Sequence, residues 1–287
     1  MDPDDPGATS ELAVQRSRSL SARSLLLTLL GEFVLPHGGS VWTATITETL
    51  QTLGVEDKAA RQALARTASA GFIKSERIGR RTLWRLTELG HQLLSEGTER
   101  IYQFSNRPVE WDGQWLVVAV TVPDTQRKLR HQLRTQLTWA GMGSPAPGLW
   151  VVPGAGRVDQ VRKIVSDLGL ESTTLSWIGP ASGIGETNNM VHAAWRLDEV
   201  RTAYQKFLSD FEHRIALTPI QSFAAQTELV HRWRQFPFLD PELPAELLDS
   251  HWPSSRARIV FDKCHDAWHD RAQSYWVSLN NEAGNRN

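Results

Sequence analysis

The first third of the chain repeats apolar residues at spacings of three and four, the pattern of helices with one buried face. The first helix is predicted over residues 21–34, with a buried stripe of Leu25, Leu26, Leu29, Leu30 and Phe33. A short strand at Val41-Trp42 precedes a second helix over 43–53. Gly54 ends that helix, because glycine adopts the left-handed conformation that a helix end requires.

A third predicted helix has two different faces. It begins after Glu56-Asp57, where acids suit the positive end of the helix dipole, and ends at Gly71. Its inner face carries Ala60, Ala63, Leu64 and Thr67. Its outer face carries Lys58, Arg61, Gln62, Ala65, Arg66 and Ser69. Residues 72–74 and 83–86 then predict two strands, joined by a tip over 77–81 that contains Arg77, Arg80 and Arg81.

Basic residues are concentrated in this part of the chain. Eight Lys and Arg side chains lie from Lys58 to Arg85 with Glu76 as the one acid among them, although the formal net charge of the whole chain is −1. Such a surface suits a polyanion, and Arg and Gln make bidentate contacts with guanine and adenine. The order helix, helix, strand, basic turn, strand predicts a winged helix-turn-helix that binds duplex DNA. The alternative is a small α+β unit with a solvated charged hairpin. The candidate DNA-binding residues are Lys58, Arg61, Gln62, Ala65, Arg66, Ser69, Arg77, Arg80 and Arg81.

Strands and helices alternate after a connecting helix over 87–104. Arg107-Pro108 marks a boundary, because the residue before a proline avoids the helical conformation. The pattern predicts strands over 115–122, 149–152 and 173–178, and helices over 125–139 and 158–168. This β-α-β-β-α-β-like order is typical of a ferredoxin-like sandwich. Helices dominate from Trp195 onward, over 197–214, 220–235, 244–248 and 254–280.

Length and composition limit the number of domains and the class of protein. A length of 287 residues favours two or three domains in an α+β protein. The predicted division is a disordered tail (1–20), a winged helix with its connecting helix (21–104), a ferredoxin-like domain (111–180) and a helical C-terminal domain (181–287). The hydrophobic fraction is 40%, with no long apolar run and no charged leader. This predicts a soluble protein without a membrane span, and the lone Cys264 fits a reducing cytoplasm.

Several segments together resemble the PaaX family of bacterial transcriptional repressors, which control phenylacetate and related aromatic catabolism. The likeness covers about residues 21–280 and is carried by Leu29-Leu30-Gly31-Glu32-Phe33-Val34, Ala60-Arg61-Gln62-Ala63-Leu64, Trp111-Asp112-Gly113-Gln114-Trp115, Pro147-Gly148-Leu149-Trp150-Val151 and Phe236-Pro237-Phe238-Leu239-Asp240-Pro241. The resemblance implies a winged helix, a middle domain with a Cas2-like fold, a helical C-terminal domain and a homodimer. It also implies operator binding relieved by a ligand, phenylacetyl-CoA in the best-known members. Accordingly, we expect no enzymatic activity and no cofactor.

The middle and C-terminal regions contain the side chains from which an effector site could be made. Ten of the 12 Trp residues lie beyond residue 110. Tryptophan faces would hold an aryl group, and arginines would neutralise a carboxylate or the phosphates of a CoA thioester. The candidates are Trp139, Trp150, Arg157, Trp195, Arg232, Trp233 and Phe236. The alternative for these tryptophans is an ordinary place in a core. Dimer contacts are expected from the same regions, on an inverted-repeat operator.

Two features leave open a different function, a metal-dependent nuclease or hydrolase. Relatives often have an acid just before the proline at the end of the first middle-domain strand, but this chain has only Asp124 after Pro123, where it suits a helix cap. His265 and His269 are four apart on a predicted helix, a spacing that can chelate a metal ion but also that of neighbours on a polar helix face. The local sequence places no third ligand, so no metal site is predicted.

Overall fold

The computed structural model describes residues 21–105 and 110–285. The tail predicted over 1–20 lies outside the described residues. The chain divides into two compact units, each assembled from separate stretches of sequence. Unit 1 comprises Met1–Phe104, Asp210–Arg234 and Ile259–Asn287, and unit 2 comprises Ser105–Ser209 and Gln235–Arg258. None of the helices in the described residues is long and apolar enough to cross a membrane.

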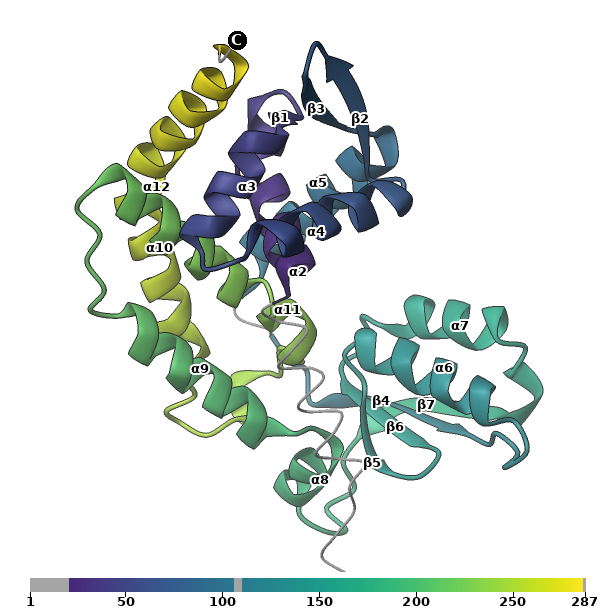
Figure 1. The fold of residues 1–287 in the computed structure, drawn as a ribbon. Coiled ribbons are helices and arrows are strands. Elements are labelled where there is room, and N and C mark those ends of the chain that lie inside the picture. The colour runs from purple at the N-terminus through teal and green to yellow at the C-terminus, as the bar shows by residue number, and fades with distance from the viewer. Residues whose placement is uncertain (1–20, 106–109, 286–287) are drawn as a thin grey trace, which may run out of the picture. The chain divides into compact units, whose positions relative to one another are not determined.

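Unit 1 joins the elements of the N-terminal third to two helices from the C-terminal third (Figure 1). Its N-terminal elements are α2 (Ala22–Leu29), a π-helical turn η1 (Leu30–Val34), a 3-10 turn η2 (Leu35–His37), β1 (Ser40–Trp42), α3 (Thr43–Thr52), α4 (Asp57–Ser69), β2 (Ile73–Ile78), β3 (Arg81–Leu86) and α5 (Glu88–Gln103). Its C-terminal elements are α10 (Pro219–Trp233) and the part of α12 (Ser254–Asn285) that begins at Ile259.

Side-chain caps set the start of several of these helices. The Ser21 hydroxyl accepts a hydrogen bond from the Ser24 amide at the start of α2 (3.2 Å). The Thr87 hydroxyl does the same for the Gly90 amide at the start of α5 (3.0 Å). A cap of this kind satisfies an amide that has no partner within the helix.

The strands of unit 1 form an antiparallel sheet in the order β1-β3-β2. β2 and β3 pair from Ile73↔Leu86 to Ile78↔Arg81, which leaves Gly79 and Arg80 as a two-residue turn. The φ of 61° at Gly79 suits the first central position of a type II′ turn. The predicted tip over 77–81 was therefore too long, since Arg77 and Arg81 lie in the strands.

The core of unit 1 is shared between the two ends of the chain. Leu26 of α2 is completely buried in a cluster that includes Phe223 of α10 and Trp276 of α12. The ring centroid of Phe33 lies 4.9 Å from that of Phe223 and 5.4 Å from that of Trp276. The N-terminal elements therefore depend on C-terminal side chains to close their core.

Unit 2 is built around an antiparallel sheet in the order β5-β6-β4-β7. Its elements are β4 (Gln114–Val120), α6 (Arg127–Trp139), β5 (Gly143–Ala146), β6 (Leu149–Pro153), α7 (Val158–Asp167), a 3-10 turn η3 (Glu171–Thr173), β7 (Thr174–Pro180), α8 (Thr187–Ala194), α9 (Leu197–Phe211) up to Ser209, α11 (Phe236–Leu239) and a 3-10 turn η4 (Ala245–Leu247). From β4 to β7 the strands and α-helices follow the predicted β-α-β-β-α-β order.

Strand β4 is covered on both faces. Leu116, Val118 and Val120 pack in one cluster with residues of α6 and α7, which lie along one side of the sheet in Figure 1. Trp115 points to the other face, where its ring centroid lies 6.4 Å from that of Trp195. Alternate residues of a strand face opposite sides, so the apolar run 115–120 supplies both clusters.

Candidate nucleic-acid interface

The outer face of α4 is exposed as predicted. The buried residues of the helix are Ala60, Ala63, Leu64 and Thr67. The exposed residues include all six predicted outer positions: Lys58, Arg61, Gln62, Ala65, Arg66 and Ser69. Arg61 Nε lies 2.7 Å from Asp57 Oδ2, one helical turn away, and both side chains are largely exposed. An exposed pair of this kind contributes little to stability, so Arg61 can exchange Asp57 for another anion.

The turn between β2 and β3 adds a second group of exposed basic side chains. Arg80 lies in the turn itself, and Arg77 precedes it with its Nε donating to the Gly79 carbonyl (3.3 Å). Arg85 and Glu76 form an exposed ion pair between neighbouring strands (2.7 Å). Both groups of basic side chains belong to unit 1.

Arg81 differs from its neighbours because it is half-buried against the end of α12. Its Nη1 donates to the carbonyls of Ala283 (2.9 Å) and Gly284 (2.5 Å). Its guanidinium also lies 4.6 Å from the centroid of the Trp42 ring. The last carbonyls of a helix have no partner within it, and a cation suits the negative end of the helix dipole. Arg81 therefore caps α12.

A second contact joins α12 to the start of α3. The side-chain oxygen Oδ1 of Asn280 accepts from the Trp42 amide (3.2 Å) and from the Thr45 hydroxyl (3.0 Å). The amide of Trp42, which precedes α3, and a hydroxyl in the first turn of α3 thus share an acceptor on a helix from the other end of the chain. These contacts hold the C-terminal helix against the sheet and helices that carry the basic surface.

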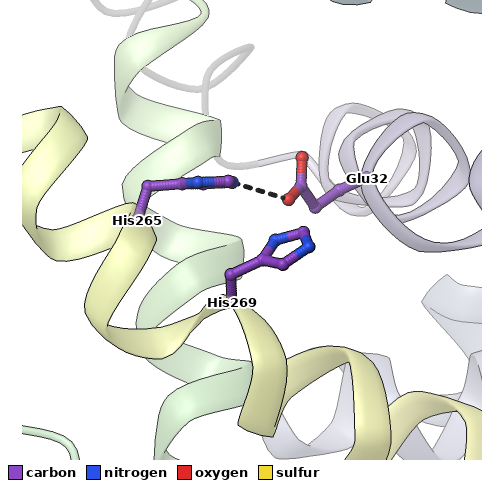
Figure 2. Close-up of side chains that lie close together, drawn as sticks. All are labelled: Glu32, His265 and His269. Carbon is purple, nitrogen blue, oxygen red and sulfur yellow. Dashed lines mark hydrogen bonds and ion pairs between the residues drawn. The ribbon is translucent and has the colours of Figure 1, made fainter.

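A buried polar cluster lies deeper in unit 1, shown in Figure 2. His265 and His269 of α12 meet Glu32 of the π-helical turn η1, and one potential ligand atom from each lies within 4.8 Å of the others. His265 Nε2 lies 3.1 Å from Glu32 Oε1. The local sequence could not reveal Glu32 as the third member, because it is 233 positions away from His265.

The other acid considered for metal chemistry, Asp124, is engaged on the surface of unit 2. Its Oδ1 accepts from Arg130 Nη2 (2.6 Å), and its side chain is fully exposed. The expectation that Asp124 caps α6 was wrong, because the residue preceding that helix is Gln126, and no side chain makes a capping hydrogen bond there.

The candidate effector residues lie in different surroundings. In unit 2, Trp150 belongs to the cluster beneath α6 and α7, Trp195 to the cluster on the opposite face, and Trp139 is 67% exposed. Arg157 precedes α7 and is exposed, and Phe236 is buried. In unit 1, Arg232 is half-buried, and Trp233 is completely buried. Four of these aromatic side chains therefore serve in packing: Trp150, Trp195, Trp233 and Phe236.

The segment that begins at Phe236 is held by a buried carboxyl. Tyr204 donates its hydroxyl to Asp240 Oδ2 (2.6 Å), and its ring stacks on Phe236 with centroids 4.1 Å apart. Burial raises the pKa of the Asp240 carboxyl, while the Tyr204 hydrogen bond and the Glu242 amide act in the opposite direction. Burial and the charge of Asp240 raise the pKa of Tyr204, so its phenol stays protonated and donates.

Comparisons with known proteins match three successive stretches of the chain. Three family models match the chain: PaaX-like protein over residues 21–90, PaaX protein central Cas2-like domain over 108–191, and PaaX-like protein C-terminal domain over 195–278. Transcriptional repressor PaaX of Escherichia coli (strain K12) is 29% identical over an alignment of 250 residues, which covers 83% of this chain and 78% of the relative.

A solved structure supports the fold. The uncharacterized protein Rv0674 from Mycobacterium tuberculosis superposes with a TM-score of 0.61 at 21% identity, covering 89% of this chain and 99% of the other. The middle of unit 2 thus has the Cas2-like fold, and the three matched segments account for 21–90, 108–191 and 195–278. The chain belongs to the PaaX family.

Proposed function

We propose that this chain is a transcriptional repressor that binds operator DNA through unit 1 as a winged helix-turn-helix. The observation that carries the proposal is the outer face of α4, whose polar side chains are exposed in the same unit as a hairpin with a basic turn. A helix of this kind fits the major groove, and a basic hairpin reaches phosphates or the minor groove. The Escherichia coli relative, a transcriptional repressor, supports the same proposal.

The proposed contacts with DNA are of two kinds, those with base edges and those with the backbone or minor groove. Arg61 and Gln62 are proposed to contact base edges, and Arg80 to contact the phosphate backbone or the minor groove. Arg81 was expected to act with Arg80. Its Nη1 is bound to the carbonyls of Ala283 and Gly284, so a phosphate that takes over this nitrogen would free the end of α12.

The test compares four variants of the full chain, three single and one double, on a duplex site recovered by in vitro selection. Arg61→Ala is expected to weaken binding by about 1–3 kcal/mol and to relax sequence preference. Arg80→Ala should weaken binding to all sequences and reduce the salt dependence by about one unit. Arg162→Ala is the matched control, since Arg162 is an exposed, paired arginine of α7. Unchanged affinity in an Arg61→Ala/Arg80→Ala double variant would exclude this surface.

The same experiment separates the alternative function. A metal-dependent nuclease or hydrolase would cleave DNA and lose that activity in EDTA. A repressor should bind the selected duplex and leave it intact in the presence of Mg²⁺, Mn²⁺ or Zn²⁺. Cleavage that survives in the Arg61→Ala/Arg80→Ala variant and disappears in EDTA would favour the enzyme.

We further propose that the repressor is a two-fold dimer on an inverted repeat, joined through unit 2. β7 is the last strand of its sheet, and Leu175, Trp177 and Ile178 on it are 72%, 53% and 48% exposed. Edge strands with apolar side chains pair readily with a second copy. Trp177→Lys should sediment as a monomer, whereas Ile184→Lys, at a fully exposed position, should leave the dimer intact. Dimeric Trp177→Lys would exclude β7.

The effector is proposed to be an aromatic acid or an aryl-CoA thioester. Among the candidate residues Trp139 and Arg157 are exposed, so they can meet a ligand without rearrangement of a core. Such a ligand should quench tryptophan fluorescence and release the operator over the same concentration range. Release that is unchanged in Arg157→Ala would remove that residue from the site. Failure of all aromatic acids and aryl-CoA thioesters would place the effector outside this class.

A further inference from the structure

We propose that Glu32, His265 and His269 bind a divalent transition-metal ion within unit 1, with Zn²⁺ as the ion that best fits the ligands. The two histidines lie one turn apart on α12 and face the carboxylate of the π-helical turn η1 (Figure 2). Two imidazoles and one carboxylate are a common ligand set for Zn²⁺ and related ions. Mg²⁺ and Ca²⁺ prefer oxygen ligands throughout.

The distances fit an ion after a small movement of side chains. With metal–ligand bonds of about 2.1 Å, two ligands of a tetrahedral ion lie about 3.4 Å apart. Glu32 Oε1 and His265 Nε2 are already 3.1 Å apart. The ligand atom of His269 lies within 4.8 Å of both, so a side-chain rotation brings it into the same shell.

The carboxylate of Glu32 lacks a permanent positive partner. It is buried, and in the described part of the chain its one ionisable partner of opposite charge is His265. Tyr102 donates to Oε2 and Gln226 donates to Oε1, both at 2.6 Å. Two neutral donors and a histidine compensate a buried carboxylate less completely than a divalent ion would.

Two glutamine side chains that donate to Glu32 each have a buried oxygen without a hydrogen-bond donor. Gln226 is completely buried, and its Oε1 has no hydrogen-bond donor. Gln273 Nε2 donates to the Glu32 carbonyl (3.1 Å), and its Oε1 is also buried without a donor. Exchanging the oxygen and nitrogen of the Gln226 amide would place its oxygen against the Glu32 carboxylate, where the two oxygens would repel each other. The absence of a donor for Gln226 Oε1 therefore does not come from a reversed amide.

The surroundings hold the ligands in place. The His265 ring packs against Phe261 and meets the edge of Tyr102, at centroid distances of 5.8 and 5.3 Å. The Tyr102 hydroxyl also orients the second oxygen of Glu32. Groups that orient metal ligands in this way strengthen binding. Glu32 itself lies in a π-helical turn, a distortion that is frequent at functional sites.

An ion at this place would lie where three segments of unit 1 meet. Glu32 follows α2, Gln226 lies in α10, and the two histidines lie in α12. Because the unfolded chain does not hold these groups together, binding stabilises the folded unit by mass action. The metal would therefore tie the C-terminal helices to the elements that carry the basic surface.

The test uses the full chain, free of any affinity tag and stripped of metal with a chelator. Calorimetric titration with Zn²⁺ should give one ion per chain and a raised melting temperature. His269→Gln should weaken binding at least roughly tenfold. His213→Gln is the control, because His213 is an exposed histidine of unit 1 beside Glu212. Absence of zinc binding, equal binding by His269→Gln, or loss of binding in His213→Gln would overturn the proposal.

A second measurement needs no variant and remains informative if His269→Gln does not fold. Co²⁺ bound to the native chain should give the visible absorption of a tetrahedral site, and Zn²⁺ X-ray absorption should show two imidazoles and additional oxygen ligands. A six-coordinate, all-oxygen environment would instead indicate adventitious surface binding and would exclude the site.

Discussion

Replacing Phe223 by alanine is expected to loosen the N-terminal elements of unit 1, although Phe223 lies in α10. Its side chain is completely buried, with ring centroids 4.9 Å from Phe33 and 6.2 Å from Trp276. Removing a buried phenylalanine ring costs about 3–5 kcal/mol, because burial is lost and a cavity remains. Phe33, on the N-terminal side of the cluster, loses an aromatic neighbour, so the segment that follows α2 should be destabilised as well.

Hydrogen exchange of the full chain measures which segments lose stability in Phe223→Ala. A loss of 3 kcal/mol corresponds to roughly 150-fold faster exchange for amides that open with the core. Peptides from residues 22–34 should show this acceleration in Phe223→Ala. Ile220→Ala is the control on the same helix, since Ile220 is 45% exposed and its loss costs within about 0.5 kcal/mol. If residues 22–34 exchange at the native rate in Phe223→Ala, the shared core is not a cooperative unit.

Three further outcomes follow from contacts described above. Asp240 has a higher pKa in the folded state than its ordinary 3.8, so its contribution to stability is present below that ordinary pKa and is lost as the pH rises through the higher folded pKa. Asp240→Asn should flatten this fall in the free energy of unfolding, and parallel pH curves for the two proteins would contradict the reasoning. Arg81→Met should speed amide exchange in the last turn of α12 about tenfold, whereas Arg80→Met should not. In thermal unfolding Trp150→Ala should cost about 3–5 kcal/mol and exposed Trp139→Ala within about 0.5 kcal/mol.

The helices and strands could be predicted because their signals are local. The acids Glu56 and Asp57 and the glycine Gly71 predicted the two ends of a helix that spans Asp57–Ser69, and Gly71 has the φ of 78° that a helix end requires. The apolar run that predicted β4 likewise follows from a strand that is covered on both faces. The predicted ends of the strands were less accurate, because backbone pairing with a neighbouring strand sets them. β2 extends to Ile78 because its backbone pairs with β3, and no side-chain pattern specifies that extension.

The candidate site could be predicted only in part. The exposed side chains of α4 follow from helical geometry alone, so their prediction needed no long-range contact. The partners of Arg81 could not be predicted, since Ala283 and Gly284 accept through backbone carbonyls that carry no sequence signal. The cluster around His265 needs Glu32 from the opposite end of the chain, and only the packing of α12 on η1 brings them together.

Segments that are neighbours in the sequence do not pack as separate units, so the stability of the N-terminal elements depends on helices from the C-terminal third. The three family segments follow one another along the chain, whereas unit 1 takes α10 and most of α12 into the core of the N-terminal elements. Each fully buried side chain such as Leu26 stabilises the fold by roughly 1.5–3 kcal/mol, against a total of about 5–15 kcal/mol for a typical domain. A fragment that ends near Ser105 would therefore lose its fold before it could report on DNA contacts. By the same reasoning, a ligand that changes the packing of α10 or α12 would also change the positions of the elements that carry the basic surface, because these elements share one core.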